Sequence, residues 1–296
     1  MIVSACAGTA LEPASPTSTT SSSPSNTTST STTTPPTTST IAPTTTTTEA
    51  QPRCRPNPFT EEFSAALSSD YPGVEITAHV HHLRSNCGYS LNRDVRRITA
   101  SVFKVMVMAG TLLEAQNDGR KPTEFEMNQM IPMITESANS PVRSLWRSFG
   151  ASPWFREQAE IFGLRETRAT GDGGQAWGGT KTSALDQVNL IRQVLLGDWG
   201  PLNAEYRQMA LELMTSVVPD QTWGITAGVP DSWTVAQKNG FAGRTTNSVG
   251  WVDEPGDSRG YVIAILTRGW SSWQQGIPAV ERISEQVAET MIETEG

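Results

Sequence analysis

The feature that most constrains the fold is the apolar run Ile98–Gly110, ITASVFKVMVMAG, which contains a single charged residue, Lys104. Residues 101–117 predict a helix that is apolar nearly all round, and such a helix must be buried on most sides. Burying an unpaired ammonium is costly, so Lys104 needs partners close by. The chain must therefore fold into several layers around this helix, with polar groups brought to the lysine.

The size and charge of the chain set limits on its class. Of its 296 residues, 245 follow a low-complexity N-terminal segment, enough for one large domain or two closely packed lobes. The net charge of −8 gives no basic footprint, so a nucleic-acid partner is not expected. No run of 18 apolar residues predicts a membrane-spanning helix.

The N-terminus predicts export and anchoring. Val3-Ser4-Ala5-Cys6 resembles the bacterial lipobox, in which the cysteine is lipidated, although only five residues precede Cys6. We interpret residues 1–6 as the remnant of a truncated signal peptide. Residues 7–51 are rich in Ser, Thr and Pro and predict a disordered stalk. This layout predicts an extracytoplasmic protein, either anchored to the cell membrane through a lipid on Cys6 or secreted.

The two remaining cysteines, Cys54 and Cys87, lie in the predicted folded part, residues 52–296. Outside the cytoplasm they can form a disulfide; the alternative is two unpaired thiols.

The order of predicted elements indicates the fold class. Strand patterns occur early and late in the chain, on either side of a helical middle. We therefore expect an α+β fold, in which an antiparallel sheet carries flanking helices and a helical lobe, with the site between the two. Helices are expected at 59–67, 101–117, 124–135, 141–149, 153–162, 182–196, 204–216 and 279–293, and strands at 74–82, 89–92, 234–241, 247–253 and 260–269.

The three histidines, His79, His81 and His82, all lie on one predicted strand. His79 and His81 share a face, so a metal pair is one interpretation. Because no Cys or carboxylate cluster is nearby, ordinary sheet surface is favoured. We expect no metal and no cofactor, and none of the three histidines suits a Ser-His-Asp triad.

Ser101 and Lys104 are three residues apart at the start of the apolar helix, so they share a face. A serine hydroxyl needs a base to become a nucleophile, and a lysine can be that base if burial lowers its pKa. The backbone N–H groups at the helix start suit an oxyanion. The alternative is a lysine that extends its amine to solvent.

Two later segments add to this pair. Lys238 and Gly240 lie on a predicted strand, QKNGF, where the glycine allows another backbone or a ligand to approach closely. The loop ESANS, residues 136–140, offers the hydroxyl of Ser137 and the amide of Asn139.

The order S-x-x-K, S-x-N, K-x-G resembles the penicillin-recognising serine hydrolases, that is, the class A β-lactamases and penicillin-binding proteins. SVFK, SAN and KNG carry the resemblance, and WGGTKTSALDQVNLIRQVLLGD and NSVGWV…YVIAILT resemble the segment after the omega loop and the closing strands. The resemblance extends from Cys54 to the C-terminus and is closest to exported actinobacterial class A β-lactamase-related serine hydrolases. It implies the β-lactamase/transpeptidase-like fold.

The resemblance also implies roles. Ser101 would be acylated, Lys104 would accept its proton, and Ser137 would pass a proton to the leaving nitrogen. Lys238 would bind a carboxylate and tune Ser137. The substrate-binding set would comprise Asn139 for the substrate amide, Asn239, Gly240, Phe241, whose N–H would complete the oxyanion hole with that of Ser101, and Arg244 beside the carboxylate.

Three departures from the family pattern limit the predicted activity. Ala138 replaces the usual Asp, Asn239 replaces the usual Thr or Ser, and the E-x-x-L-N signature of the deacylating glutamate is missing. Glu166 begins ETRAT, which does not fit that signature. Acylation remains possible, but hydrolysis of a β-lactam adduct should be slow.

The sequence thus predicts an exported serine hydrolase that forms an acyl-Ser101 intermediate. Its substrate would be a β-lactam, a cell-wall peptide or a related amide or ester, and a monomer is expected. One alternative is a non-catalytic binding or sensor lipoprotein of the same fold. The other is a purely structural surface protein, in which Lys104 would point to solvent.

Overall fold

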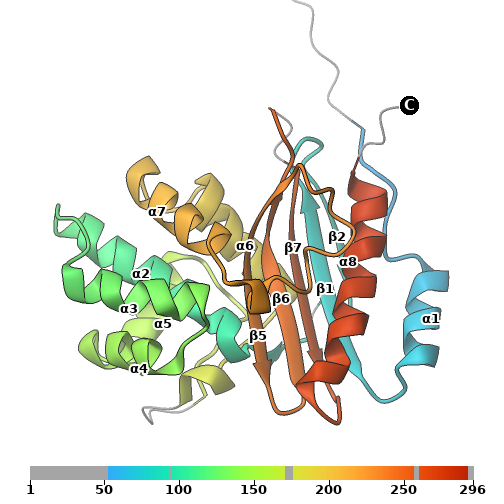
Figure 1. Ribbon diagram of the computed structural model, residues 1–296, viewed down its shortest axis with the longest axis horizontal. Coiled ribbons are helices and arrows are strands. Elements are labelled where there is room, and N and C mark those ends of the chain that lie inside the picture. The colour runs from blue at the N-terminus through green and yellow to red at the C-terminus, as the bar shows by residue number, and fades with distance from the viewer. Residues whose placement is uncertain (1–52, 94, 171–175, 257–259, 293–296) are drawn as a thin grey trace, which may run out of the picture. The chain divides into compact units, whose positions relative to one another are not determined.

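The centre of the computed structural model is a five-stranded antiparallel sheet with the strand order β2-β1-β7-β6-β5 (Figure 1). The predicted pairing of early and late strands is confirmed, because the early strand β1 pairs along its whole length with the late strand β7. The strands are β1 Glu75–His82, β2 Cys87–Leu91, β5 Thr234–Ala242, β6 Thr245–Asp253 and β7 Tyr261–Arg268.

The structure describes residues 53–93, 95–170, 176–256 and 260–292. The expected signal-peptide remnant, with Cys6, and the expected stalk lie outside these residues.

The sheet is covered on both faces, and alternation along β7 shows how. Its side chains point alternately into two apolar cores, as the two-residue period of a strand requires. Val262, Ala264 and Leu266 belong to the core shared with the helical lobe. Tyr261, Ile263 and Ile265 belong to the core under the C-terminal helix.

The helices form two groups around the sheet (Figure 1). One group, α1 Glu61–Asp70 and α8 Ile277–Met291, covers one face. The other forms the helical lobe: α2 Phe103–Asn117, α3 Glu124–Thr135, α4 Asn139–Ser148, α5 Ser152–Ile161, α6 Ala184–Ile191 and α7 Ala204–Thr215. The α+β prediction, with an antiparallel sheet, flanking helices and a helical lobe, is confirmed. Within the described ranges, none of the helices has the length and apolarity needed to cross a bilayer.

Helix α2 is the buried helix that the apolar run predicts. Twelve of its 15 residues are buried, and it begins after a single 3₁₀ turn, η1 Ala100–Val102. The segment leading into that turn, β3 Arg97–Ile98, pairs with β4 Lys181–Thr182. The chain before Ser101 is therefore held by strand pairing.

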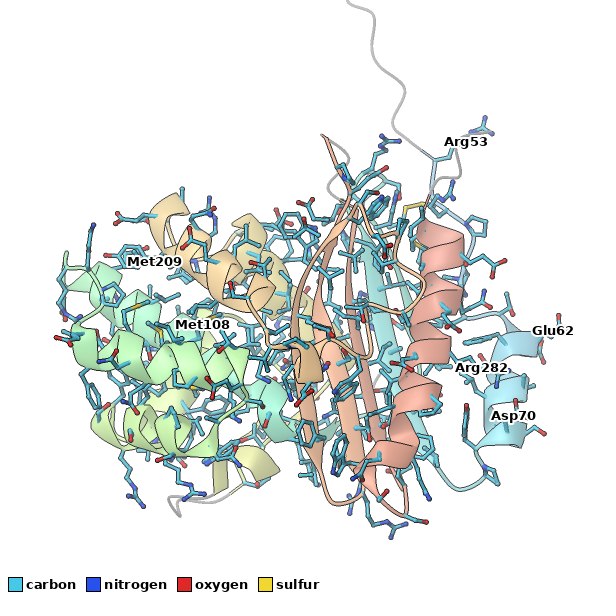
Figure 2. All side chains as sticks on the ribbon, in the orientation of Figure 1. Arg53, Glu62, Asp70, Met108, Met209 and Arg282 are labelled. Carbon is cyan, nitrogen blue, oxygen red and sulfur yellow. A yellow bond between two sulfur atoms is a disulfide. The ribbon has the colours of Figure 1, made fainter. Side chains whose placement is uncertain are left out.

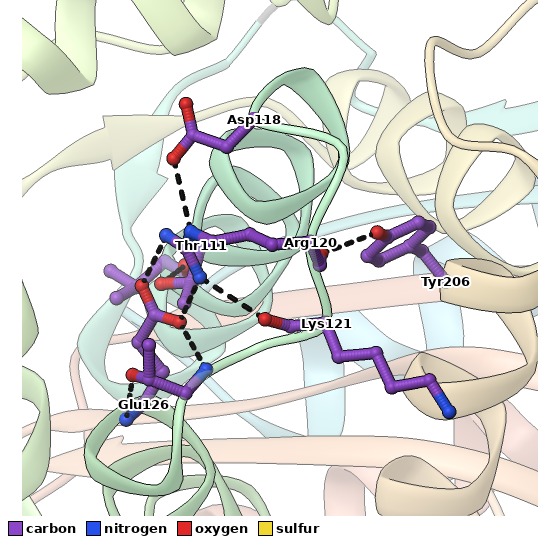
Figure 3. Close-up of polar contacts among 8 residues, drawn as sticks. Thr111, Asp118, Arg120, Lys121, Glu126 and Tyr206 are labelled. Carbon is purple, nitrogen blue, oxygen red and sulfur yellow. Dashed lines mark hydrogen bonds and ion pairs between the residues drawn. The ribbon is translucent and has the colours of Figure 1, made fainter.

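The start of α3 is fixed by a capping box, in which Thr123 and Glu126 satisfy each other's backbone N–H groups. Arg120 donates to both carboxylate oxygens of Glu126, at 2.7 and 3.0 Å, and its own carbonyl accepts from Tyr206 Oη at 2.6 Å (Figure 3). This polar cluster ties the α2–α3 turn to α7, and α3 in turn leads directly to the loop with Ser137.

A disulfide joins the segment before α1 to the sheet, and an ion pair joins the two helices of the outer layer to each other. Cys54 and Cys87 are bonded, as predicted, so the segment before α1 is attached to β2. Arg282 of α8 reaches Asp70 at the end of α1, with Nη1 and Oδ2 2.6 Å apart (Figure 2).

The histidines are not on a solvated sheet surface, and that interpretation is wrong. His79, His81 and His82 are buried, because α6 packs across β1. Their rings bond to Ser90, Asn86 and Ser85. Burial lowers the pKa of His79 and of His81 to about 4, so both are neutral at pH 7. The described residues contain no group of three or more His, Cys, Asp or Glu side chains placed to hold a metal ion.

We predict that removing the disulfide with Cys54→Ser and Cys87→Ser together lowers the free energy of unfolding by roughly 3–4 kcal/mol. The physical reason is the sequence separation of 33 residues that the bond closes. Chemical denaturation measures the effect. Dithiothreitol should lower the stability of the parent protein and leave that of the double variant unchanged; equal stability of the oxidised and reduced parent would contradict the prediction.

Candidate active site

Four polar side chains from three separate elements meet at the edge of the sheet. Lys104 Nζ lies 3.0 Å from Ser101 Oγ and 3.3 Å from Ser137 Oγ. Lys238 Nζ lies 2.9 Å from the same Ser137 Oγ. These residues come from the start of α2, the α3–α4 loop and β5, and we call them the Ser101 cluster.

The alternative of a solvent-directed lysine is wrong, because Lys104 has 0 % of its surface exposed. A purely structural surface protein, which required that orientation, loses its support.

The turn that carries Ser101 is hydrogen-bonded to the sheet. Asn247 on β6 donates its amide to the carbonyls of Ile98 and Thr99, at 2.8 and 3.0 Å, and accepts from Thr267 N at 2.9 Å. Ala100, next to Ser101, has φ 45°, a left-handed conformation that is uncommon for a residue other than glycine. Such conformations cost energy and are found where surrounding contacts over-determine them.

The partners of Lys104 fit a neutral amine as well as an ammonium. Besides Ser101 Oγ, the amine lies 2.5 Å from the carbonyl oxygen of Ser137 and 2.9 Å from Asn139 Oδ1. Both of these oxygens can only accept hydrogen bonds. A neutral amine has two N–H donors for them and one lone pair left for the Ser101 hydroxyl. After taking that proton, the ammonium has three donors for the same three oxygens, so both states fit one geometry.

The surroundings of Lys104 favour the neutral amine. The four oxygens around Lys104 Nζ are all uncharged, and the Trp177 ring covers the amine, 5.4 Å from Nζ to the ring centroid. Burial lowers the pKa of Lys104 to about 7. A substantial share of the molecules therefore carries a neutral Lys104 near pH 7, as a general base requires.

Ser137 lies between two amines. Lys238 is 1 % exposed and also donates to the carbonyl of Asn239 at 2.9 Å. Burial, and then the nearby Lys104, hold the pKa of Lys238 well below its ordinary value. Two neighbouring lysines repel each other when both are ammonium ions, so it is unfavourable for both to be protonated at once. The Ser137 hydroxyl therefore connects two amines that can exchange a proton.

The backbone around Ser137 is shaped for this position. Ser137 has φ 61°, which turns its carbonyl as well as its hydroxyl to Lys104. The next residue, Ala138, donates its backbone N–H to Pro132 O at 3.0 Å, and α4 begins at Asn139. This tight turn lies between α3 and α4. It brings Ser137 and Asn139, the first residue of α4, to the same amine.

Gly240 confirms the expectation of a close approach. A Cβ at this position would lie 2.8 Å from both the carbonyl oxygen of Thr99 and the backbone nitrogen of Val102. The approaching backbone is therefore the turn that carries Ser101. Phe241 is the next residue along β5, the edge strand of the sheet, and so lies next to that turn.

Two predicted substrate-binding side chains are directed elsewhere. Asn239 is 1 % exposed; it donates to the carbonyls of Gln221 and Trp223 and accepts from Ser248 Oγ. Arg244 donates to the carbonyls of Gly269 and Trp270 at the end of β7. Both side chains are occupied by backbone groups of loops, which sequence spacing could not reveal.

Sequence reasoning missed Trp177 and Asn247. Trp177 lies in the glycine-rich segment, where only its residue type distinguishes it. Asn247 carries a clearer signal, because an Asn within the buried strand NSVGWV must have partners for its amide.

Glu166 is not part of the cluster. Its carboxylate pairs with Arg96, 2.6 Å from Arg96 Nε, and its side chain is 44 % exposed. The hydrogen-bond partners recorded for the Ser101 cluster among the described residues include no carboxylate.

A sequence model of the Beta-lactamase enzyme family matches residues 129–291, and the chain belongs to this family. The matched part contains Ser137, Asn139, Lys238 and Gly240, whereas Ser101 and Lys104 precede it. A search of curated protein sequences found no significant match.

Several solved structures share the fold of this chain. An acyl-enzyme complex of a PBP-A mutant with penicillin G is 20% identical, with a TM-score of 0.68, over 77% of this chain and 94% of that one. A β-lactamase from Desulfarculus baarsii is 17% identical, with a TM-score of 0.68, over 78% and 96%. A class A β-lactamase from Mycobacterium abscessus is 18% identical, with a TM-score of 0.67, over 77% and 97%. The predicted resemblance and the β-lactamase/transpeptidase-like fold are confirmed.

We predict that, below pH 7, the rate of Ser101 acylation increases about tenfold for each unit by which the pH is raised. Above pH 7 the rate should level off. Lys104 accepts a proton only when neutral, and burial sets its pKa at about 7. Stopped-flow measurement with a chromogenic ester or β-lactam between pH 5 and 9 gives the profile. A rate that does not change over this range would contradict the assignment of Lys104 as the base.

We predict that Gly240→Ala lowers the acylation rate by about tenfold or more and the free energy of unfolding by roughly 1–3 kcal/mol, because the added methyl group overlaps the Ser101 turn. Gly178→Ala is the matched control, since a Cβ there meets no atom within 4 Å. Its free energy of unfolding should change by less than about 0.5 kcal/mol. Unchanged acylation in Gly240→Ala would refute the packing argument.

Proposed function

We propose that this protein is an exported serine hydrolase that works through an acyl-Ser101 intermediate. One observation carries the proposal: the buried amine of Lys104 lies 3.0 Å from Ser101 Oγ, among oxygens that leave its lone pair for the serine proton.

The first half of the reaction follows from the contacts. Lys104 Nζ takes the proton of Ser101 Oγ as the oxygen attacks the substrate carbonyl carbon. The backbone N–H groups of Ser101 and Phe241 stabilise the oxyanion. The tetrahedral intermediate then collapses, and the bond between the carbonyl carbon and the leaving nitrogen or oxygen breaks. Ser137 Oγ gives its proton to the leaving atom and is reprotonated by Lys104, with Lys238 tuning Ser137 and Asn139 beside the substrate.

The second half of the reaction is slow in this proposal. Deacylation needs a base that activates water against the ester, and among the residues that the structure describes no carboxylate hydrogen-bonds to the Ser101 cluster. Lys104 would have to act as the base a second time, although its amine already contacts Ser101 and Ser137. We therefore expect the acyl-enzyme to accumulate.

The substrate class is an amide or ester, with β-lactams and cell-wall peptides as the candidates. A PBP-A mutant, 20% identical to our chain, forms an acyl-enzyme complex with penicillin G. That likeness makes penicillin G the first probe to use.

The location belongs to the proposal as well. We propose that residues 1–6 are the remnant of a signal peptide, that residues 7–51 form a stalk, and that the domain, residues 52–296, is held at the membrane as a monomer through a lipid on Cys6. The Cys54–Cys87 disulfide supports an oxidising compartment.

A sensor that is acylated without useful turnover is the second candidate. The lack of a carboxylate among the described partners of the cluster favours it, because such a protein would keep its adduct.

We predict that fluorescent penicillin or an activated ester adds one acyl group to Ser101, detected by intact-protein mass spectrometry and peptide mapping. Loss of the adduct should be much slower than its formation. Ser101→Ala should give no adduct and Ser137→Ala a slower one.

The outcomes separate the proposals. An adduct that never turns over favours the sensor, and slow release of product favours the hydrolase. No adduct on Ser101, together with no ester hydrolysis, would defeat the hydrolase and the acylated sensor, and would leave a non-catalytic protein of this fold that binds without acylation. Rapid β-lactam turnover would contradict the slow second half.

A further inference from the structure

A cavity of about 650 Å³ lies where the end of α5 meets α6. Its walls come from parts of residues 161–166 and 183–193 and from Arg93 and Trp199. None of the four residues of the Ser101 cluster lines this cavity, and the proposed reaction does not use it. Its volume falls within the range of roughly 300–1,000 Å³ that is typical of small-molecule sites. We call it the α5–α6 cavity.

The cavity exposes two large apolar side chains, Trp199 and Ile161, whose exposed fractions are 64 % and 45 %. Apolar surface that is gathered at one place marks a binding site more often than a single exposed residue does. The indole is also held in place, since the Arg192 guanidinium lies over the ring, 4.4 Å from its centroid, and Arg192 Nε donates to Asp198 Oδ2 at 3.0 Å. Trp199 has φ 45°, a conformation that is uncommon for a bulky residue. The fold therefore holds a flat apolar surface at the cavity instead of burying it in the core.

The cavity also contains two cations that are not engaged within the described part of the chain. Among the described residues, no carboxylate and no hydrogen-bond acceptor pairs with the side chain of Arg93 or of Arg165. The two acids of the cavity are each engaged: Glu166 pairs with Arg96, and the buried Asp186 accepts two hydrogen bonds, at 2.7 and 2.8 Å. A guanidinium binds a carboxylate or a phosphate through paired hydrogen bonds. The two arginines therefore suit an anion.

A neutral polar group adds to these cations. Asn189 lines the cavity from α6, and its side-chain amide has no hydrogen-bond partner among the residues that the structure describes. This amide can donate to, or accept from, a hydroxyl or an amide of a ligand.

We propose that the α5–α6 cavity binds a small organic anion, in which a carboxylate is attached to a flat ring. The ring stacks on Trp199, and the carboxylate pairs with Arg165 and Arg93. Sugar acids and aromatic acids share this chemistry, because each combines an apolar ring face with a negative charge. The inference goes beyond the proposed function: it assigns a second ligand site and requires no acylation of Ser101.

The indole N–H signals of the full chain labelled with ¹⁵N-tryptophan test the site. The chain has nine tryptophans, and Trp199→Phe and Trp223→Phe assign the two signals that matter. Trp199 reports on the cavity, and Trp223, whose ring lies 6.1 Å from that of Phe241, reports on the region beside the Ser101 cluster.

Two matched pairs of probes separate the sources of the anion. N-acetylmuramic acid carries a carboxylate that N-acetylglucosamine lacks, and benzoate differs from benzamide in its charge. In at least one pair, the acid should shift the Trp199 signal and bind at least about tenfold more tightly than its neutral partner. The pair that responds shows whether the ligand is a sugar acid or an aromatic acid. No shift of Trp199, equal affinities within both pairs, or shifts confined to Trp223 would overturn the inference.

Two substitutions link the preference to the guanidinium groups. Arg165→Gln and Arg93→Gln should each weaken binding of the preferred acid by about tenfold and leave the free energy of unfolding unchanged. Arg147→Gln is the matched control, because this exposed arginine lies on α4 and does not line the cavity. Its affinity should equal that of the parent. Unchanged affinity in both cavity variants would also overturn the inference.

The Ser101→Ala variant keeps this inference separate from the proposed function. Because Ser101 does not line the cavity, the variant should bind the acid as tightly as the parent does. Loss of binding in Ser101→Ala would place the acid at the Ser101 cluster and overturn the inference. Acylation of the parent is read by mass spectrometry, so binding to the cavity can hold where the proposed function fails.

Discussion

The exclusion of water from the amine of Lys104 is the constraint on which the site depends. An ammonium buried without a carboxylate is costly, and the chain accommodates it by lowering the pKa of Lys104 to about 7. The neutral amine then fits its three neighbours, Ser101, Ser137 and Asn139, by donor and acceptor count. The same burial that stabilises α2 in the core thus lowers the pKa of Lys104 to the range that a base for Ser101 would need.

The fold supplies this environment through a contact between a sheet edge and a helix start. Gly240 lets β5 touch the turn before α2, and Asn247 on the next strand holds the carbonyls of Ile98 and Thr99. The α3–α4 loop then closes the third side with Ser137. Because each contact comes from a different element, displacement of any one of them would open the lysine to water and raise its pKa.

Sequence reasoning predicted what local patterns encode. The start of α3 follows from its capping box, and Ser101 meets Lys104 because three residues make most of a helical turn. Ser137 and Lys238 were placed by the order of motifs, not by spacing. The orientations of Asn239 and Arg244 and the burial of His79 and His81 could not be predicted. They depend on carbonyls of distant loops and on α6 lying across β1.

Direct titration of the lysines by NMR tests the central claim. The chain has four lysines, Lys104, Lys121, Lys181 and Lys238, so ¹³Cε-labelled lysine gives a spectrum simple enough to assign by substitution. We predict that the Lys104 signal titrates near pH 7 in the absence of any substrate. A Lys104 signal that stays protonated to pH 10 would show that the buried amine is an ammonium, and Ser101 would then have no base.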